Sequence, residues 1–335
     1  MKSIQSRLYL VIILLFTFAA CEFVEVDSTI GNTGSSGDTT GTTAGTPTPV
    51  SPLPIPTCSW ESMQNVTSLS LQDVTFGNGV YVAAGKGGMK AYSTDGVNWT
   101  APAPISIDLS SIAFGSNQIV AVGWNGRRVT SKDGVVWNND MVGGNDLYGV
   151  AYGNNIFVAV GLHGRTIVSS NFGSNWTNDM VLGGNNNTLN SVRFINGHFV
   201  ALGHDKRIIS STDGVNWTTM RAPTKNSNAL LDIAYGNGRY VAVGFGGHIV
   251  HSTDGVNWNL IYSDAEHLIS VTFGNNIFVA VGTSGNRIVS TDGAKWSAMC
   301  QGGDHLRGVA FLNGQFMAVG DNGAIYTHST LTSAN

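Results

Sequence analysis

The sequence has few charged residues, few cysteines and little that favours helix. Only 11% of its 335 residues are Asp, Glu, Lys or Arg, and long runs of the helix formers Ala, Glu, Lys and Leu are absent. The net charge of −4 gives no overall basic surface that could displace counterions, so we expect no nucleic-acid partner. Glycine is abundant instead, with 43 residues, which indicates many short strands and tight turns.

Only one stretch is continuously apolar, and it lies near the N-terminus. The run Leu8–Phe18 is too short to span a bilayer comfortably and is followed by two alanines and Cys21. The pattern predicts a signal peptide over residues 1–21. It resembles a bacterial lipobox, with Phe18 where Leu is usual, which implies lipidation of Cys21. The alternative is an ordinary signal peptide cut near Ala20, in which Cys21 has no role.

Residues 22–57 are rich in Gly, Ser and Thr and then in Pro, and this composition cannot bury enough apolar surface to order itself. We therefore predict a disordered linker between the lipid anchor and a folded body. This arrangement places the protein in the cell envelope, lipid-anchored and either periplasmic or surface-exposed.

A seven-residue segment, STDGVNW, recurs unchanged at Ser93–Trp99, Ser211–Trp217 and Ser252–Trp258. Near copies stand at Ser131–Trp137, Ser169–Trp176 and Ser290–Trp296. Successive tryptophans, counted from Trp60, are 38 to 41 residues apart. A period of about 40 residues is typical of propellers, in which each repeat forms one four-stranded sheet.

Each repeat contains the same parts. In the first, Leu71–Gly77, Val80–Gly85 and Met89–Ser93 are expected to be strands, with an Asn78-Gly79 hairpin turn and a fourth strand that contains Trp99. Seven first strands are recognisable, beginning at Leu71, Leu109, Leu147, Leu189, Leu230, Leu268 and Leu306.

The last repeat lacks its fourth strand, and an unmatched tryptophan segment, Cys58–Met63, precedes the first repeat. Pairing this segment beside Ile325–Ser329 would close the ring and remove exposed sheet edges. The sequence therefore predicts an all-β fold, a seven-bladed β-propeller over residues 58–330 whose N-terminal strand completes the last blade.

The recurring segment resembles the Asp-box, or BNR, repeat of propellers that include sialidases and photosystem II assembly factors related to Ycf48. Ser169–Trp176 has the spacing of that repeat, and the other copies are one residue shorter. The resemblance implies a structural hairpin, because Ser and Asp side chains can bind local N–H groups. The residues given this structural role are Asp95, Asp133, Asn171, Asp213, Asp254 and Asp292.

Turns between strands two and three share one face of the ring with the loops that join successive blades. These turns and loops vary between repeats, so we expect a ligand there. Arginines and a histidine at the starts of third strands would form an arc suited to a carboxylate or phosphate. The arc consists of Arg127, Arg165, Arg207 and His248. The alternative is that these side chains are solvated or paired with loop acids.

The same face carries aromatic and histidine side chains. Trp124 and Phe245 could hold a sugar ring or a protein anchor, and His163 and His204 lie on neighbouring blades. No histidine pair has close ligand spacing, so no metal is expected. We expect no other cofactor.

Taken together, these features predict a monomeric, membrane-tethered scaffold that binds a protein or an acidic glycan, without catalytic residues. The alternative is a sialidase-like glycan hydrolase, which would need a tyrosine nucleophile and carboxyl groups beside the arginines. Cys58 and Cys300 are expected on adjacent outer strands roughly 20 Å apart, beyond disulfide reach. We therefore predict that both remain free, unless the fourth strand of blade six curls back.

Overall fold

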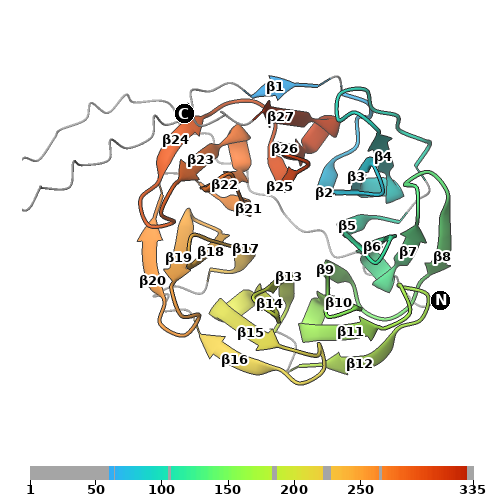
Figure 1. Ribbon diagram of the computed structural model, residues 1–335, viewed down its shortest axis with the longest axis horizontal. Coiled ribbons are helices and arrows are strands. Elements are labelled where there is room, and N and C mark those ends of the chain that lie inside the picture. The colour runs from blue at the N-terminus through green and yellow to red at the C-terminus, as the bar shows by residue number, and fades with distance from the viewer. Residues whose placement is uncertain are drawn as a thin grey trace, which may run out of the picture. The chain divides into compact units, whose positions relative to one another are not determined.

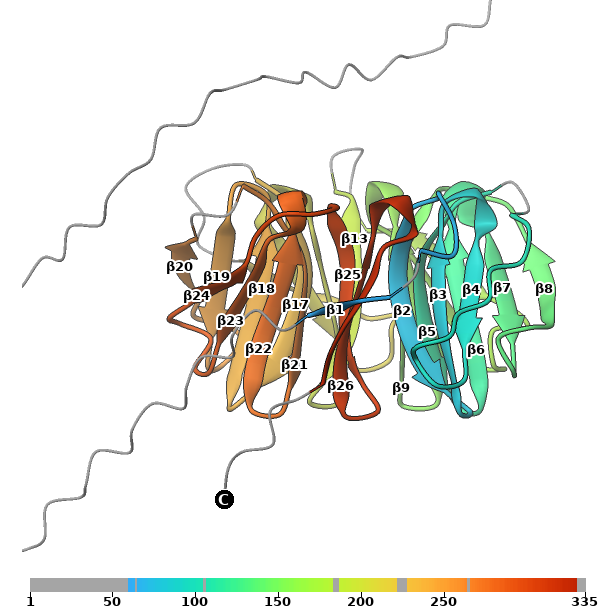
Figure 2. The ribbon, with the colours of Figure 1, turned by 90° about the horizontal axis from the view of Figure 1, so that it is seen from above.

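The computed structural model describes residues 60–63, 65–104, 107–182, 187–221, 228–263 and 266–329. The predicted signal peptide, Cys21 and the linker lie outside these residues. Seven antiparallel sheets are arranged in a ring (Figure 1), and their strands run between its two faces (Figure 2). The prediction of an all-β, seven-bladed propeller is confirmed. No helix in the described part of the chain is long and apolar enough to cross a membrane.

Figure 1 shows one strand of each blade nearest the centre of the ring. Each of these inner strands begins with a fully buried leucine. These inner strands are β2 (Leu71–Gly77), β5 (Leu109–Gly115), β9 (Leu147–Gly153), β13 (Leu189–Ile195), β17 (Leu230–Gly236), β21 (Leu268–Gly274) and β25 (Leu306–Leu312). The pairing with the second strand shifts register between the first and third residues of six of them. In β9 the shift falls at the corresponding place on its partner.

Second strands follow tight turns and are almost wholly buried. They are β3 (Val80–Gly85), β6 (Gln118–Gly123), β10 (Ile156–Gly161), β14 (His198–Gly203), β18 (Arg239–Gly244), β22 (Ile277–Gly282) and β26 (Gln315–Gly320). Short 3-10 turns lead into the third strands in six blades: η1 (Lys86–Gly88), η2 (Trp124–Gly126), η3 (Leu162–Gly164), η4 (His204–Lys206), η5 (Thr283–Gly285) and η6 (Asp321–Gly323). The third strands are β4 (Lys90–Ser93), β7 (Arg128–Ser131), β11 (Arg165–Ser169), β15 (Arg207–Ser211), β19 (His248–Ser252), β23 (Arg287–Ser290) and β27 (Ile325–Ser329).

Five blades have a fourth strand that follows their own recurring segment: β8 (Trp137–Met141), β12 (Thr177–Val181), β16 (Thr218–Arg221), β20 (Asn259–Tyr262) and β24 (Ser297–Cys300). Blade one differs from the expectation, because its fourth segment makes only an isolated bridge between Tyr92 and Thr100. Pro102 and Pro104 follow this bridge, and proline has no N–H to donate to a neighbouring strand. The ladder therefore ends there.

The N-terminal segment closes the ring as predicted, over a shorter length. Strand β1 (Glu61–Ser62) pairs antiparallel with β27, and the Met63 N–H donates to the Ile325 carbonyl at 2.8 Å. The Trp60 ring lies 5.6 Å from the Arg287 guanidinium group of blade six. The closing segment therefore contacts both of the last two blades.

The prediction that Cys58 and Cys300 both remain free is wrong for Cys300, which is disulfide-bonded. Its partner lies outside the described residues, as do Cys21 and Cys58. The prediction assumed regular outer strands. In the structure, register shifts between Arg287, which pairs with Cys300, and Ile288, so the end of β24 departs from a regular ladder.

The core lies between blades, with seven apolar clusters at the seven contacts between neighbouring sheets. Glycines at the ends of inner strands allow this close contact. A Cβ atom on Gly115 would lie 2.0 Å from the Tyr152 ring of the next blade. The glycine therefore leaves the space that the neighbouring aromatic ring fills.

The recurring segments form hairpins held by their own side chains. In the first, Asp95 Oδ1 accepts hydrogen bonds from the N–H groups of Val97 and Asn98, both at 2.8 Å. The Trp99 indole donates to the Gly96 carbonyl at 3.1 Å. Hydrogen bonds from the Asn98 side chain and these N–H groups lower the pKa of Asp95 well below its usual range. Equivalent contacts engage the acceptor oxygens of Asp133, Asn171, Asp213, Asp254 and Asp292.

Candidate functional site

All seven blades contribute to a cavity of about 270 Å³ at the centre of the ring. It is lined mainly by the second and third residues of the inner strands, together with Trp124 from η2. Since η2 belongs to the variable turns, the cavity opens on the variable face. We refer to it as the funnel; its lining side chains include Gln72, Asp73, Ser110, Ser111, Trp124, Tyr148, Asn190, Arg193, Asp232, Ile269 and Arg307.

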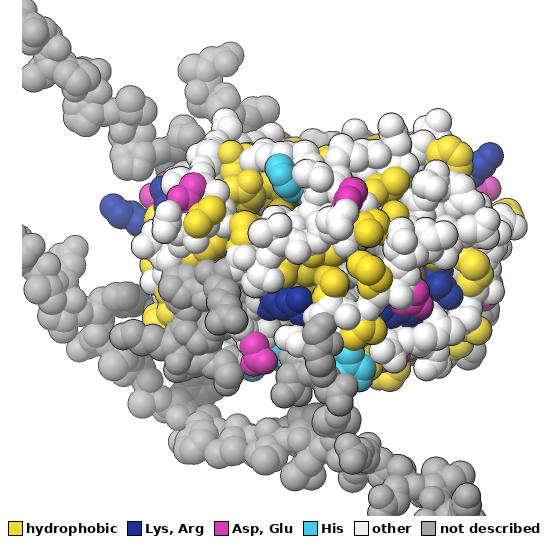
Figure 3. Space-filling model, turned by 90° about the horizontal axis from the view of Figure 1, so that it is seen from below, with side chains coloured by type: hydrophobic (Ala, Val, Ile, Leu, Met, Phe, Trp, Pro, Cys, Tyr) yellow, Lys and Arg dark blue, Asp and Glu magenta, His cyan; other side chains and the backbone are white. Residues whose placement is uncertain are grey.

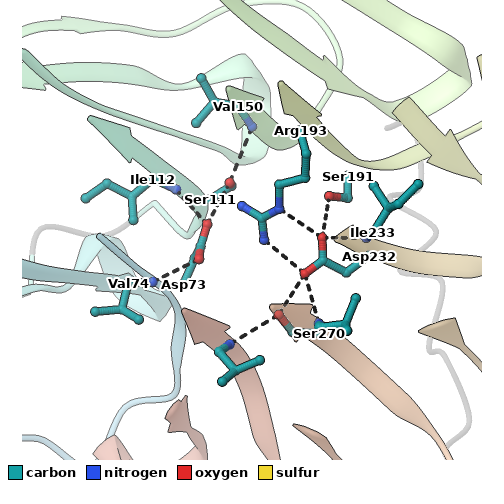
Figure 4. Close-up of polar contacts among 12 residues, drawn as sticks. Asp73, Val74, Ser111, Ile112, Val150, Ser191, Arg193, Asp232, Ile233 and Ser270 are labelled. Atoms are coloured by element: carbon teal, nitrogen blue, oxygen red, sulfur yellow. Dashed lines mark hydrogen bonds and ion pairs between the residues drawn. The ribbon is translucent and has the colours of Figure 1, made fainter. Parts of the chain in front are cut away.

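The third residues of the inner strands link neighbouring blades. Asp73 Oδ2 accepts hydrogen bonds from the Ser111 hydroxyl at 2.8 Å and from the Ile112 N–H at 3.1 Å, both in the next blade. Ser111 Oγ in turn accepts from the Val150 N–H one blade further, at 3.3 Å (Figure 4). These contacts hold the inner strands of blades one to three in a fixed relation.

Asp232 is the most heavily bonded acid in the funnel. Arg193 forks onto it, with Nε 3.0 Å from Oδ1 and Nη2 2.9 Å from Oδ2. The hydroxyls of Ser191 and Ser270 donate to the same carboxylate at 2.9 and 2.7 Å. The N–H groups of Ile233 and Val271 also donate to it. Asp232 therefore has no acceptor capacity left for a ligand.

The Arg193 guanidinium lies between this cluster and the Asp73–Ser111 pair (Figure 4). Burial raises the pKa of Asp73, and the nearby Arg193 and the hydrogen bonds from Ile112 and Ser111 oppose that rise. Partial burial of Arg193 lowers its pKa, but the attraction of Asp232 and Asp73 outweighs this and raises it, so the side chain stays charged.

Arg193 also divides the centre of the ring. At the equivalent position the other inner strands carry only Ala or Thr: Thr75, Ala113, Ala151, Ala234, Thr272 and Ala310. A second cavity of about 380 Å³, bounded by blades four to seven, contains Arg193 in its lining as the funnel does. The Arg193–Asp232 pair thus forms the floor of the funnel.

The second residues of the inner strands form the funnel wall, and they differ from blade to blade. Gln72 Nε2 is buried and has no hydrogen-bond partner. The Asn190 amide donates to the Leu230 carbonyl at 2.8 Å, and Arg307 forks onto Asp321 at 2.7 and 2.9 Å. Trp124 at the rim is 51% exposed.

The residues of the predicted arc do not line the funnel. Arg127 is buried and forks onto Asp140 of β8 at 2.5 and 2.9 Å. Arg165 is buried and forks onto Asp179 of β12 at 2.7 and 2.9 Å. In both residues the remaining Nη1 donates to a backbone carbonyl. For Arg127 and Arg165 the structure therefore shows the alternative given above, pairing with an acid. The acids lie on strands rather than in loops.

Arg207 and His248 have other environments. Arg207 Nη1 donates to the Leu182 carbonyl, and no described acid lies within ion-pair distance of it. His248 is buried, with Nδ1 2.5 Å from the Phe245 carbonyl and its ring 4.9 Å from that of Tyr262. The four members of the arc therefore do not present a continuous cationic surface.

The remaining predicted residues are spread around the face. Phe245 is 40% exposed, and its ring meets His267 edge-on at 5.2 Å. His163 is partly exposed and His204 exposed, each in the 3-10 turn of its own blade. Among the described residues no group of three His, Cys, Asp or Glu side chains could hold a metal. Figure 3 shows one side of the ring, where charged side chains are few among uncharged ones.

The funnel was not predicted, because turns and loops rather than inner strands were expected to carry the ligand. A signal was present in the repeat itself. Aligning the seven inner strands on their first leucine shows that the second position is the most varied: Gln72, Ser110, Tyr148, Asn190, Leu231, Ile269 and Arg307. For Arg127 and Arg165 the signal was an aspartate three residues after the blade's tryptophan, at Asp140 and Asp179.

Comparison with known proteins supports the fold. No protein-family model matches the sequence, and no curated protein matches it. Among solved structures, Ycf48 bound to a D1 peptide is similar with a TM-score of 0.66 and 17% identity, over 83% of this chain and 100% of that one. A catalytically inactive virginiamycin B lyase from Staphylococcus aureus, solved with quinupristin, has a TM-score of 0.71 at 11% identity, over 82% and 99%.

The WD40 propeller domain of Doa1 is also similar, with a TM-score of 0.67 at 10% identity, over 82% of this chain and 96% of that one. At these identities the likeness concerns the fold.

Proposed function

We propose that this protein is a binding scaffold of the cell envelope, and that the funnel face of the propeller holds a segment of a partner protein. The funnel is the observation that carries the proposal. It is concave and has aromatic and polar side chains in its wall. Hydrogen bonds link the inner strands of blades one to three to one another, and likewise those of blades four to seven. Binding sites commonly combine a rigid frame, a hollow and a few converging polar groups.

We propose a protein partner for two reasons: the exposed tryptophan at the rim of the funnel, and the peptide bound by a propeller of similar fold. Trp124 is half exposed beside the funnel, and exposed tryptophans are frequent anchors in protein interfaces. The precedent is Ycf48, a propeller of similar fold whose structure was solved bound to a D1 peptide. Catalysis is not part of the proposal, because six hydrogen bonds occupy the Asp232 carboxylate and three bind the Asp73 carboxylate to the frame.

The test uses the full-length protein with a photo-crosslinking amino acid in place of Trp124, produced in cells. We expect a discrete adduct that protease digestion and mass spectrometry identify as a protein. Val256, which is exposed on the opposite face, is the matched control position. Equal adducts from both positions, or adducts from Val256 alone, would contradict the proposal.

The tether is a separate part of the proposal. We propose that Cys21 carries lipid and that residues 22–57 hold the propeller away from the membrane. Changing Cys21 to Ser should move the protein from the membrane fraction to the soluble fraction after cell lysis. A protein that stays with the membrane, or a wild-type N-terminus that mass spectrometry finds without lipid, would refute the tether and leave the funnel proposal untouched.

An acidic glycan remains a second candidate ligand, and Arg207 is the residue of the arc proposed to bind it. This guanidinium is partly exposed and has no acid partner among the described residues, unlike those of Arg127 and Arg165. Binding of acidic glycans on an array, lost when Arg207 is changed to Ala, would favour this candidate. Binding unchanged by that substitution would remove Arg207 from consideration.

A further inference from the structure

Two donors in the funnel are left without an acceptor. The Asp232 carboxylate accepts six hydrogen bonds, and the Asp73 carboxylate accepts three. In contrast, Gln72 Nε2 is buried without a partner. No described residue accepts a hydrogen bond from Arg193 Nη1, because only Nε and Nη2 of that side chain reach Asp232. A ligand that satisfies these two donors must therefore bring an acceptor oxygen.

The charges in the funnel favour a neutral acceptor. Asp232 already pairs with Arg193, and Asp73 adds a second acid nearby. Arg307, the other arginine in the wall, pairs with Asp321. No cation in the lining lacks an acid, so a carboxylate would lose its hydration without gaining a free positive charge. A carbonyl oxygen costs much less to desolvate and can accept from two donors.

From these two observations we infer that the funnel binds an uncharged amide carbonyl of a peptide, from a main-chain turn or an Asn or Gln side chain, through Gln72 Nε2 and Arg193 Nη1. A sugar hydroxyl fits less well, since it brings a hydrogen that also needs an acceptor, and the Asp232 carboxylate beside Arg193 is filled. This inference rests on the proposed function, because it specifies what part of the partner enters the funnel. Trp124 at the rim would cover the adjoining part of the peptide.

The decisive variant is Gln72→Glu in the full-length protein, because it keeps the shape of the side chain and replaces the amide donor with oxygens that only accept. We expect capture of the partner at position 124 to fall about tenfold, since a carbonyl would then face a carboxylate. Gln118→Glu, the same change at a partly exposed residue near the opposite face, should leave capture unchanged. Unchanged or stronger capture with Gln72→Glu would overturn the inference.

The salt dependence of capture distinguishes a carbonyl ligand from a carboxylate ligand. Capture by the wild-type protein should change less than about twofold between roughly 50 and 500 mM NaCl, because screening acts on charged pairs. A steep loss at high salt would show that the ligand enters as an anion, and the inference would be wrong.

A direct measurement keeps this inference distinct from the proposed function. The full-length protein, labelled with nitrogen-15, is titrated with N-acetylglutamine methylamide, with acetate and with N-acetylglucosamine. We expect the Gln72 side-chain amide signal, identified by its absence in Gln72→Leu, to shift most with the first probe. Such a shift without an adduct at position 124 would refute the proposed partner alone. An adduct with no shift for any probe, or a larger shift with acetate or the sugar, would refute the carbonyl site alone.

Discussion

Arg193 and Asp232, from the inner strands of neighbouring blades, form a bidentate ion pair at the floor of the funnel, with N–O distances of 3.0 and 2.9 Å. The Asp232 side chain is only 4% exposed, whereas that of Arg193 is 32% exposed. Removing the arginine would leave a buried carboxylate that keeps only its hydroxyl and N–H donors.

We therefore predict that Arg193→Met lowers the free energy of unfolding by about 2–3 kcal/mol, less than for a pair in which both partners are buried, because Arg193 is partly solvated. The control is Arg307→Met, which breaks the other bidentate pair of the funnel. Asp321 in that pair is 21% exposed, so we expect a cost below about 1 kcal/mol. Urea unfolding followed by tryptophan fluorescence measures both, and equal costs would contradict the assigned role of Asp232.

Gly115 gives a prediction about the contact between blades. Gly115→Ala places a Cβ atom 2.0 Å from the Tyr152 ring, so we expect a loss of about 1–3 kcal/mol from overpacking. In the background of Tyr152→Ala, which removes the ring, the same substitution should cost much less. A double-mutant cycle in urea measures the coupling. Additive effects of the two substitutions would show that the ring does not need the glycine.

The environment of Lys90 predicts that the stability of the protein depends on pH. Burial lowers the pKa of this amine to about 8, and the nearby Arg127 acts in the same direction. In the unfolded chain the amine keeps a pKa near 10.4, so the unfolded state binds more protons between these values. The charged amine destabilises the fold below pH 8, and this penalty disappears as the pH rises toward about 10.4.

Lys90→Met removes the penalty, so we expect it to raise the free energy of unfolding by about 1–3 kcal/mol at pH 7 and by almost nothing above pH 10.4. The exposed Lys86 provides the control substitution, Lys86→Met, for which no such gain is expected. Urea unfolding from pH 7 to pH 10.5 measures the difference between the curves. A gain that does not change with pH would mean that packing rather than charge is responsible.

The disulfide of Cys300 predicts sensitivity to reductant. Breaking it should lower stability by about 2–5 kcal/mol, because the unfolded chain regains freedom. We expect dithiothreitol to lower the melting temperature of the wild-type protein and to have no effect on that of Cys300→Ser. A wild-type melting temperature that does not respond to reductant would show that the bond contributes nothing to stability.

The sequence by itself determined the ring. The recurring tryptophans, the leading leucines of the inner strands and the unmatched segment before the first repeat were enough to predict seven blades and their closure. These features are local and repeated, and each blade obeys the same pattern of burial. Where local chemistry differed, as at Pro102 and Pro104 after Trp99, the pattern failed in one blade only.

The site was decided by the tertiary structure. The sequence left open whether Arg127 is available to a ligand or paired with an acid, and the antiparallel pairing of β7 with β8 brings Asp140 beside it. Arg193 and Asp232 are 39 residues apart and meet only because successive inner strands surround one axis. Contacts between blades decide which polar groups are paired and which are left without a partner. The sequence of a single repeat does not contain these contacts.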